Sequence, residues 1–129
     1  MAPPEDWNVE RHLADKPQVV VDLYEGFVRL VAACGPYAVS GTKTAIAFKG
    51  SRRGFAGAKP RKSSLDGFLD LQRQVRDKRV LRVSPYTKRL FVHQFRITDP
   101  GQLDDSFAAL VQEAYQVGQG AHRLRPKDG

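Results

Sequence analysis

Apolar residues recur with helical spacing in two long segments, one toward each end of the chain, and each pattern predicts an amphipathic helix. The first segment is Pro17–Cys34, whose apolar stripe consists of Val20, Leu23, Phe27, Leu30, Val31 and Cys34. The second segment follows Asp99-Pro100, and its stripe consists of Leu103, Phe107, Leu110, Val111, Ala114 and Val117. Because one face of each helix is apolar, both helices are expected to pack on a common core.

Turn-forming and polar residues mark the ends of these helices. Asp15 with Gln18, and Asp99 with Gln102, have the spacing of a capping box, in which side chains satisfy the first free N–H groups of a helix. Gly35-Pro36 is suited to end the first helix, because glycine adopts a left-handed conformation and proline cannot continue a helix.

The segment between the two helices has the two-residue alternation that is typical of β-strands. Six strand candidates are separated by turn residues: Tyr37–Ser40, Thr44–Lys49, Phe55–Lys59, Leu65–Leu71, Val80–Val83 and Leu90–Ile97. Glycine and polar residues at 50–54 favour a hairpin with a five-residue loop. The order of elements predicts a two-layer α+β fold, in which a single antiparallel sheet of five to six strands carries the two main helices on one face.

Alternation also assigns side chains to the two faces of this sheet. In Leu90–Ile97, an apolar side that includes His93 alternates with a polar side that includes Arg96. We expect the helices to cover one face and leave the other face open, with Lys43, Lys49 and Arg96 on it. The pattern leaves undecided which residues of Phe55–Lys59 join the open face.

Length and composition indicate one folded domain. The chain has 129 residues, of which 41% are hydrophobic, enough for a core of ordinary size. We expect a compact domain over 1–118, a loose N-terminal tail over 1–6 and a disordered polar tail over 119–129. The chain contains neither an apolar stretch of the roughly 20 residues that span a bilayer nor a secretory signal. With a single cysteine, this predicts a cytoplasmic protein without membrane association.

Basic residues are concentrated in the middle of the chain. Residues 26–98 contain sixteen basic and three acidic residues, whereas both ends are mildly acidic, and the net charge is +7. Between Gly41 and Lys62 there are seven basic residues and no acidic one. Such segregation attracts anionic partners. A solvated surface is the more usual explanation of an ordinary charge run, but the lack of acidic residues from Gly26 to Leu65 gives a binding surface equal support here.

These features give a set of candidate binding residues around the predicted hairpin and the last strand. They are Thr42, Lys43, Thr44, Lys49, Arg52, Arg53, Lys59, Arg61, Lys62, His93 and Arg96. Lysine and arginine neutralise phosphates, and the threonines add hydroxyl donors beside small residues.

Residues that often carry catalysis do not form a recognised group. His12, His93 and His122 have no partner at zinc-binding spacing. Asp66 and Asp70 share a strand face but lie about 13 Å apart, too far for two carboxylates that act on one bond. His93 fits a core histidine better than a general base. We therefore predict no catalytic residue, no metal site and no cofactor, and favour a non-enzymatic role while leaving the enzyme question open.

Four short motifs carry a resemblance to a known family: Lys43-Thr44 with Ile46, Phe55-Ala56-Gly57, Pro60-Arg61-Lys62, and His93 two residues before Phe95. With these motifs the chain, from about Trp7 to Gly118, resembles the bacterial domain-of-unknown-function family 5655. It implies a compact α+β fold, distantly similar to YdhG-like and YjbR-like domains. It implies no established activity and supplies no catalytic residue.

Two functions remain open at this point. The first is a non-catalytic module that binds an anionic partner, such as nucleic acid or another polyanion, through the basic sheet and hairpin. The second is a small-molecule pocket, belonging to an enzyme or an accessory protein, around Lys43, Lys49 and His93. A flat basic face favours the first function, and a closed cavity of several hundred Å³ favours the second.

Overall fold

The computed structural model describes residues 8–121 and contains one six-stranded antiparallel sheet with helices at both ends of the chain. The strands are β1 (Ala38–Gly41), β2 (Ile46–Lys49), β3 (Gly54–Pro60), β4 (Leu65–Leu71), β5 (Val80–Thr87) and β6 (Leu90–Ile97). The helices are α1 (Val9–Leu13), α2 (Gln18–Ala32), the short 3₁₀ helix η1 (Pro100–Gln102) and α3 (Asp105–Gly118). The predicted α+β fold is confirmed.

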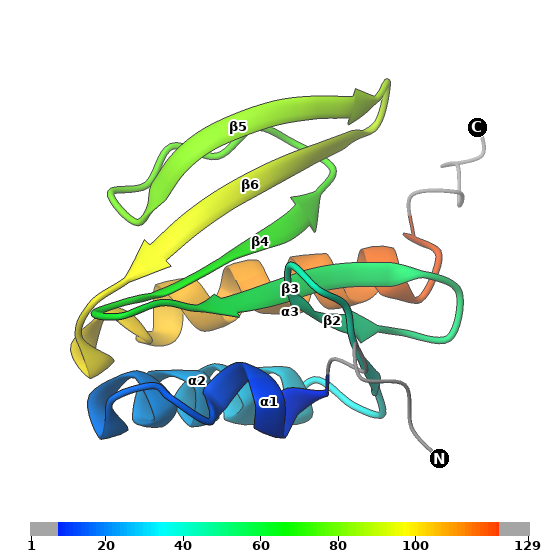
Figure 1. The fold of residues 1–129 in the computed structure, drawn as a ribbon. Coiled ribbons are helices and arrows are strands. Elements are labelled where there is room, and N and C mark those ends of the chain that lie inside the picture. The colour runs from blue at the N-terminus through cyan, green and yellow to red at the C-terminus, as the bar shows by residue number, and fades with distance from the viewer. Residues whose placement is uncertain (1–7, 122–129) are drawn as a thin grey trace, which may run out of the picture.

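The spatial order of the strands is β1-β2-β3-β4-β6-β5, so β6 lies between β4 and β5. Helices α2 and α3 cover one face of the sheet (Figure 1). Phe27 of α2 is at the centre of the core, with its ring centroid 5.5 Å from those of Phe48 and Phe95. Phe107 of α3 lies 5.2 Å from Phe95 in an edge-to-face arrangement, a geometry that aromatic pairs prefer. Both predicted stripes therefore face the sheet.

The helix starts differ from the sequence-based prediction. No capping box forms at Asp15, because Pro17 stands at the N-cap position of α2 and has no side-chain acceptor. Asp15 instead accepts a hydrogen bond of 2.8 Å from Lys16. The capping box at Asp99 does form, but it caps the N-terminus of the short helix η1. Helix α3 begins only at Asp105.

Strand β5 is longer than predicted. It continues from Val80 to Thr87, through Pro85, where a loop was expected. Proline lacks an N–H group and is tolerated only on edge strands or at bulges. Here β5 is an edge strand, and the register shifts between Pro85 and Thr87.

The strand registers decide the question that alternation left open in β3. Gly57 pairs with Phe68, and Lys59 pairs with Asp66, so these β3 residues belong to the open face. A Cβ on Gly57 would collide with the Phe68 ring. Glycine at this position therefore allows that ring to lie across the neighbouring strand.

The described chain ends just after α3. The side chain of Gln119 accepts a hydrogen bond of 2.9 Å from the backbone N–H of Ser51, so this residue is held against the β2–β3 loop. The expected N-terminal tail and most of the expected C-terminal tail, with His122, lie outside the described residues. Within 8–121, every helix is too short or too polar to cross a bilayer.

Candidate anion-binding pocket and the open sheet face

The basic residues of the predicted hairpin lie at two opposite ends of the sheet. Because β2 and β3 are antiparallel, the loop 50–53 lies at one end, and the turns 42–45 and 61–64 lie at the other. The backbone N–H groups of Arg52 and Arg53 donate to the Gly118 carbonyl over 2.9 and 3.2 Å, which fastens the loop to the end of α3. Lys49 and Arg52 are therefore far from Arg61 and Lys62.

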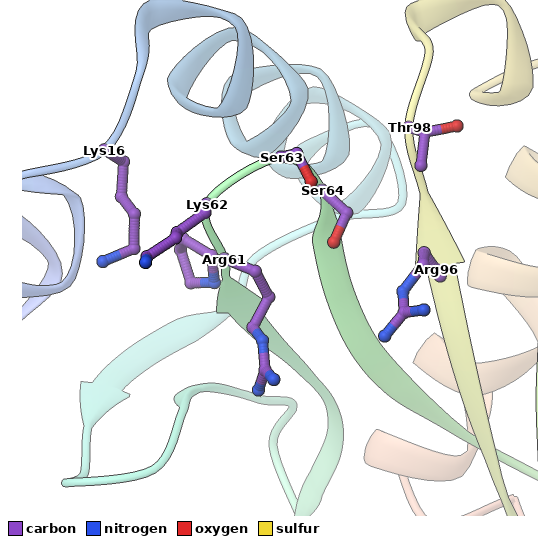
Figure 2. A pocket seen from close by; sticks show the side chains of 8 residues that line it. Lys16, Arg61, Lys62, Ser63, Ser64, Arg96 and Thr98 are labelled. Atoms are coloured by element: carbon purple, nitrogen blue, oxygen red, sulfur yellow. The ribbon is translucent and has the colours of Figure 1, made fainter.

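At the turn end, basic residues gather around an open hollow of about 720 Å³. We call it the cationic pocket; Figure 2 shows most of its lining, which consists of Lys16, Pro60, Arg61, Lys62, Ser63, Ser64, Arg96 and Thr98. These residues come from the α1–α2 loop, from the β3–β4 turn and from the end of β6. Four cations and three hydroxyls line it, and among residues 8–121 no carboxylate does.

Local hydrogen bonds position this lining. The β3–β4 turn is closed by a bond of 2.9 Å from the Arg61 N–H to the Ser64 carbonyl. Asp66 holds the Arg96 guanidinium by two bonds of 2.9 Å, and it also accepts one of 2.9 Å from the Ser64 hydroxyl. A two-bond fork of this kind fixes the plane of a guanidinium. Asp66 therefore orients Arg96 beside the pocket.

The charges at the pocket are only partly neutralised. Asp15 pairs with Lys16 over 2.8 Å, and Asp66 pairs with Arg96. Burial raises the pKa of Asp66, but hydrogen bonds from Arg96 and Ser64 outweigh burial and bring this pKa below its ordinary value. Among the described acids, none lies within ion-pair distance of Arg61 or Lys62. The pocket therefore keeps a net positive charge.

The threonine cluster expected to bind a ligand forms the β1–β2 turn. The Thr42 hydroxyl and backbone both bond to Ala45. The Thr42 carbonyl lies 2.7 Å from His12 Nε2, which ties α1 to this turn. Lys43 and Thr44 are exposed there. The polar groups of Thr42 thus serve local structure.

His93 lies on the helix side of the sheet and is only 1% exposed. Its Nε2 accepts a hydrogen bond of 2.9 Å from the Val75 N–H, and its Nδ1 lies 3.0 Å from the Phe91 carbonyl. Burial lowers the pKa of His93, which favours the neutral ring that donates at one nitrogen and accepts at the other. Both ring nitrogens are thus occupied, as expected of a core histidine.

A second hollow, of about 400 Å³, lies on the open face of the sheet. We call it the open-face hollow; it is lined by Arg53, Lys59, Phe68, Asp70, Tyr86, Val92 and Gln94. Two of these residues, Arg53 and Lys59, were predicted as binding candidates. Asp70 was predicted on the same strand face as Asp66, but only as half of a rejected carboxylate pair.

Asp70 is the one acid among the described residues that line the open-face hollow, and its pKa departs clearly from the ordinary value. It is 5% exposed, and burial raises its pKa to about 6 despite the opposing effect of Arg53. Arg53 Nη2 donates to Asp70 Oδ2 over 2.7 Å, and the Arg53 guanidinium lies 5.6 Å from the centre of the Tyr86 ring. Within the described part of the chain, Oδ1 of Asp70 has no hydrogen-bond partner. Sequence spacing gave no sign of this pairing, because Arg53 and Asp70 are 17 residues apart.

Among residues 8–121, no three potential metal ligands come together. Comparison with curated proteins and with solved structures finds no significant match. A family model described as "Domain of unknown function (DUF5655)" matches residues 9–118, from the first residue of α1 to the last residue of α3. The chain therefore belongs to this family.

Proposed function

We propose that the chain is a non-catalytic binding module for an anionic partner, and that a phosphate group of this partner binds in the cationic pocket. The observation that carries the proposal is the convergence of Lys16, Arg61, Lys62 and Arg96 on one hollow without a lining carboxylate. Arginine and lysine with hydroxyl donors are the groups that hold phosphate oxygens in proteins.

The electrostatics of the pocket support reversible, salt-sensitive binding. Arg61 and Lys62 are exposed, and the Arg96 side chain is 48% exposed. Charges that remain hydrated attract an anion over long range, but salt screens this attraction. Nucleic acid is the polyanion that we expect, bound through its phosphates with little sequence preference.

The alternative site around Lys43, Lys49 and His93 has less support. Lys43 lies in the β1–β2 turn and Lys49 at the opposite end of β2, while His93 is buried on the helix side of the sheet. The three side chains share no hollow among those described. A small-molecule site is better supported at the open-face hollow.

The test compares two double variants that remove the same charge. Arg61→Gln/Lys62→Gln removes the unpaired cations of the pocket, and Lys49→Gln/Arg52→Gln removes two cations at the other end of the sheet. Binding of pyrophosphate and of a single-stranded oligonucleotide is measured by equilibrium dialysis at two salt concentrations. Circular dichroism and thermal melting check that both variants are folded.

We expect the pocket variant to bind about three- to thirtyfold more weakly, since interactions of exposed charges contribute up to about 1 kcal/mol each. The control variant should bind pyrophosphate as wild type does. For the single-stranded oligonucleotide, each removed cation that touches a phosphate should lower the log–log salt slope by about 0.7. Equally weakened binding in both variants would show that affinity depends only on total charge, and the pocket assignment would then be wrong.

A further inference from the structure

The open-face hollow combines an apolar floor with polar walls. Phe68 and Val92 supply the apolar part, while Asp70 and Gln94 supply hydrogen-bonding groups. A few polar groups beside apolar surface is the usual composition of a small-ligand site.

Asp70 determines which kind of ligand this hollow favours. The carboxyl can accept several hydrogen bonds, yet among residues 8–121 only Arg53 donates to it, and Oδ1 is buried without a partner there. A buried oxygen that lacks its hydrogen bond carries a free-energy cost. A ligand that brings an N–H group to Asp70 would remove this cost, so the site favours ligands with donors.

Phe68 supplies a surface for a planar ring. Its side chain is half-buried and lies across Gly57, where no side chain intervenes. The Tyr86 ring lines the same hollow and is 64% exposed. Aromatic side chains on an open sheet face stack nucleobases in many nucleic-acid-binding proteins.

The two hollows are neighbours: the cationic pocket lies at the turn end of the sheet, and the open-face hollow lies beside it on the open face. Lys59 of the open-face hollow adjoins Pro60 of the cationic pocket, and Gln94 is two residues from Arg96. On β4, Asp66 orients Arg96 at one end, and Asp70 stands four residues further, about 13 Å along the strand. One nucleotide can span this distance, whereas inorganic phosphate cannot.

We propose that the anionic ligand is a nucleotide, whose phosphate binds in the cationic pocket, whose base stacks on Phe68 and whose exocyclic amino group donates to Asp70. This inference rests on the proposed function, because it uses the same phosphate site. Since solvent does not reach Oδ1, binding requires a side chain beside Asp70 to move. Arg53 is the one we expect to turn outward, because its side chain is 28% exposed.

The test uses pairs of nucleotides that differ in an amino group. Cytidine and uridine monophosphates form one pair, adenosine and inosine monophosphates the other, and pyrophosphate reports on the phosphate site alone. Affinities are measured by equilibrium dialysis for wild type, Asp70→Ala and Asp105→Ala. Asp105→Ala changes the charge equally at an exposed position of α3, outside the hollow.

Wild type should bind the amino member of each pair about tenfold more tightly or better, the discrimination that a good base contact provides. Asp70→Ala should lose this preference and keep its affinity for pyrophosphate, whereas Asp105→Ala should keep both. If Asp70→Ala fails to fold, the comparison of the paired nucleotides on wild type still decides the question.

The failures of the two proposals are distinguishable. If pyrophosphate binds but wild type does not distinguish the members of each pair, the nucleotide inference is overturned and the anion-binding proposal stands. If neither pyrophosphate nor any nucleotide binds at low salt, both fail. If nucleotides bind with the amino preference but Arg61→Gln/Lys62→Gln binds them equally well, the phosphate assignment is wrong and the inference falls with it.

One further arm separates the two sources of such a ligand. A short single-stranded oligocytidine is compared with cytidine monophosphate. Tighter binding of the oligomer per site, with a steep salt dependence, indicates single-stranded nucleic acid. Equal or weaker binding of the oligomer indicates the free nucleotide. Either result supports the nucleotide inference, whereas absence of binding to both overturns it.

Discussion

The Arg53 guanidinium reaches from the loop before β3 to the end of β4, where its Nη2 donates to Oδ2 of Asp70 over 2.7 Å. This interaction offsets only part of the free-energy cost of burying the carboxylate, because the other oxygen has no hydrogen-bond partner among residues 8–121. Burial therefore outweighs the Arg53 charge and raises the pKa of Asp70 to about 6. A group in this state links stability to pH.

The first prediction concerns this linkage. Because the folded-state pKa of Asp70 is raised, its contribution to stability is present below the ordinary value of about 3.9 and is lost as the pH rises through about 6. Replacing Asp70 with Asn removes the titration. The free energy of unfolding of Asp70→Asn relative to wild type should therefore rise by about 2 kcal/mol between pH 4 and pH 7.

Urea denaturation at several pH values measures this difference. Comparing the variant with wild type cancels the titration of His93, whose lowered pKa has the opposite effect on stability as the pH rises. A difference that does not change with pH would mean that Asp70 titrates at its ordinary pKa in the folded protein.

The second prediction concerns Arg79, a 9% exposed arginine at the start of β5. Its guanidinium bonds to Asp77, to Asp104 over 2.7 Å and to the Gln102 carbonyl over 2.6 Å, and it lies 5.3 Å from the centre of the Phe107 ring. Arg79→Met leaves both carboxylates unpaired. It should reduce the free energy of unfolding by about 2–4 kcal/mol, less than for a fully buried pair because Asp104 is half exposed.

The pH dependence identifies the cause of this destabilisation. Hydrogen bonds from Arg79 are the largest cause of the lowered pKa values of Asp77 and Asp104. Their stabilising contribution is present above the ordinary value of about 3.9 and is lost as the pH falls below it. Thermal melts of wild type and Arg79→Met should therefore converge in acid. A difference in melting temperature that stays the same at every pH would indicate that Arg79 stabilises the protein through the packing of its side chain and not through its ion pairs.

The third prediction tests the core. Phe107 is fully buried and contacts the rings of Phe27 and Phe95. Phe107→Ala should reduce the free energy of unfolding by about 3–5 kcal/mol, because it removes a large apolar side chain and leaves a cavity. Chemical denaturation gives the value. Val19→Ala, at an exposed position of α2, is the control and should change stability by less than about 0.5 kcal/mol.

The fourth prediction separates structure from binding at His93. Replacing His93 with Leu removes the acceptor of the Val75 N–H, so the variant should lose about 1–3 kcal/mol of stability. Its affinity for pyrophosphate, measured well below its melting temperature, should equal that of wild type. A folded variant that no longer binds pyrophosphate would place His93 in the site and contradict this interpretation.

Several features of this protein can be predicted from short stretches of sequence. The apolar stripes of α2 and α3, and the alternation of β6, were confirmed because burial on one side imposes a period that neighbouring residues reveal. Alternation likewise put Asp66 and Asp70 on one face of β4. The binding candidates were named residue by residue from their types and their place in a basic stretch, which gives no information about which of them lie together.

Other features depend on interactions between distant segments. Composition alone does not tell which cations converge, because the hairpin sends Arg61 and Lys62 to one end of the sheet and Lys49 and Arg52 to the other. Nor does it reveal the strand order β4-β6-β5. That order places β6 against β4 and makes β5 an edge strand, so Pro85 could continue a strand where a loop was predicted.

The sequence by itself determined the two layers, the faces of the helices and the excess of positive charge, since these follow from local periodicity and composition. The tertiary structure alone decided where charges meet. Arg96 forms an ion pair with Asp66, which is 30 residues away in the sequence, and Arg53 forms one with Asp70, which is 17 residues away. Such pairs depend on strand order and register, which are set by burial of the whole sheet and leave no periodic signal at either residue.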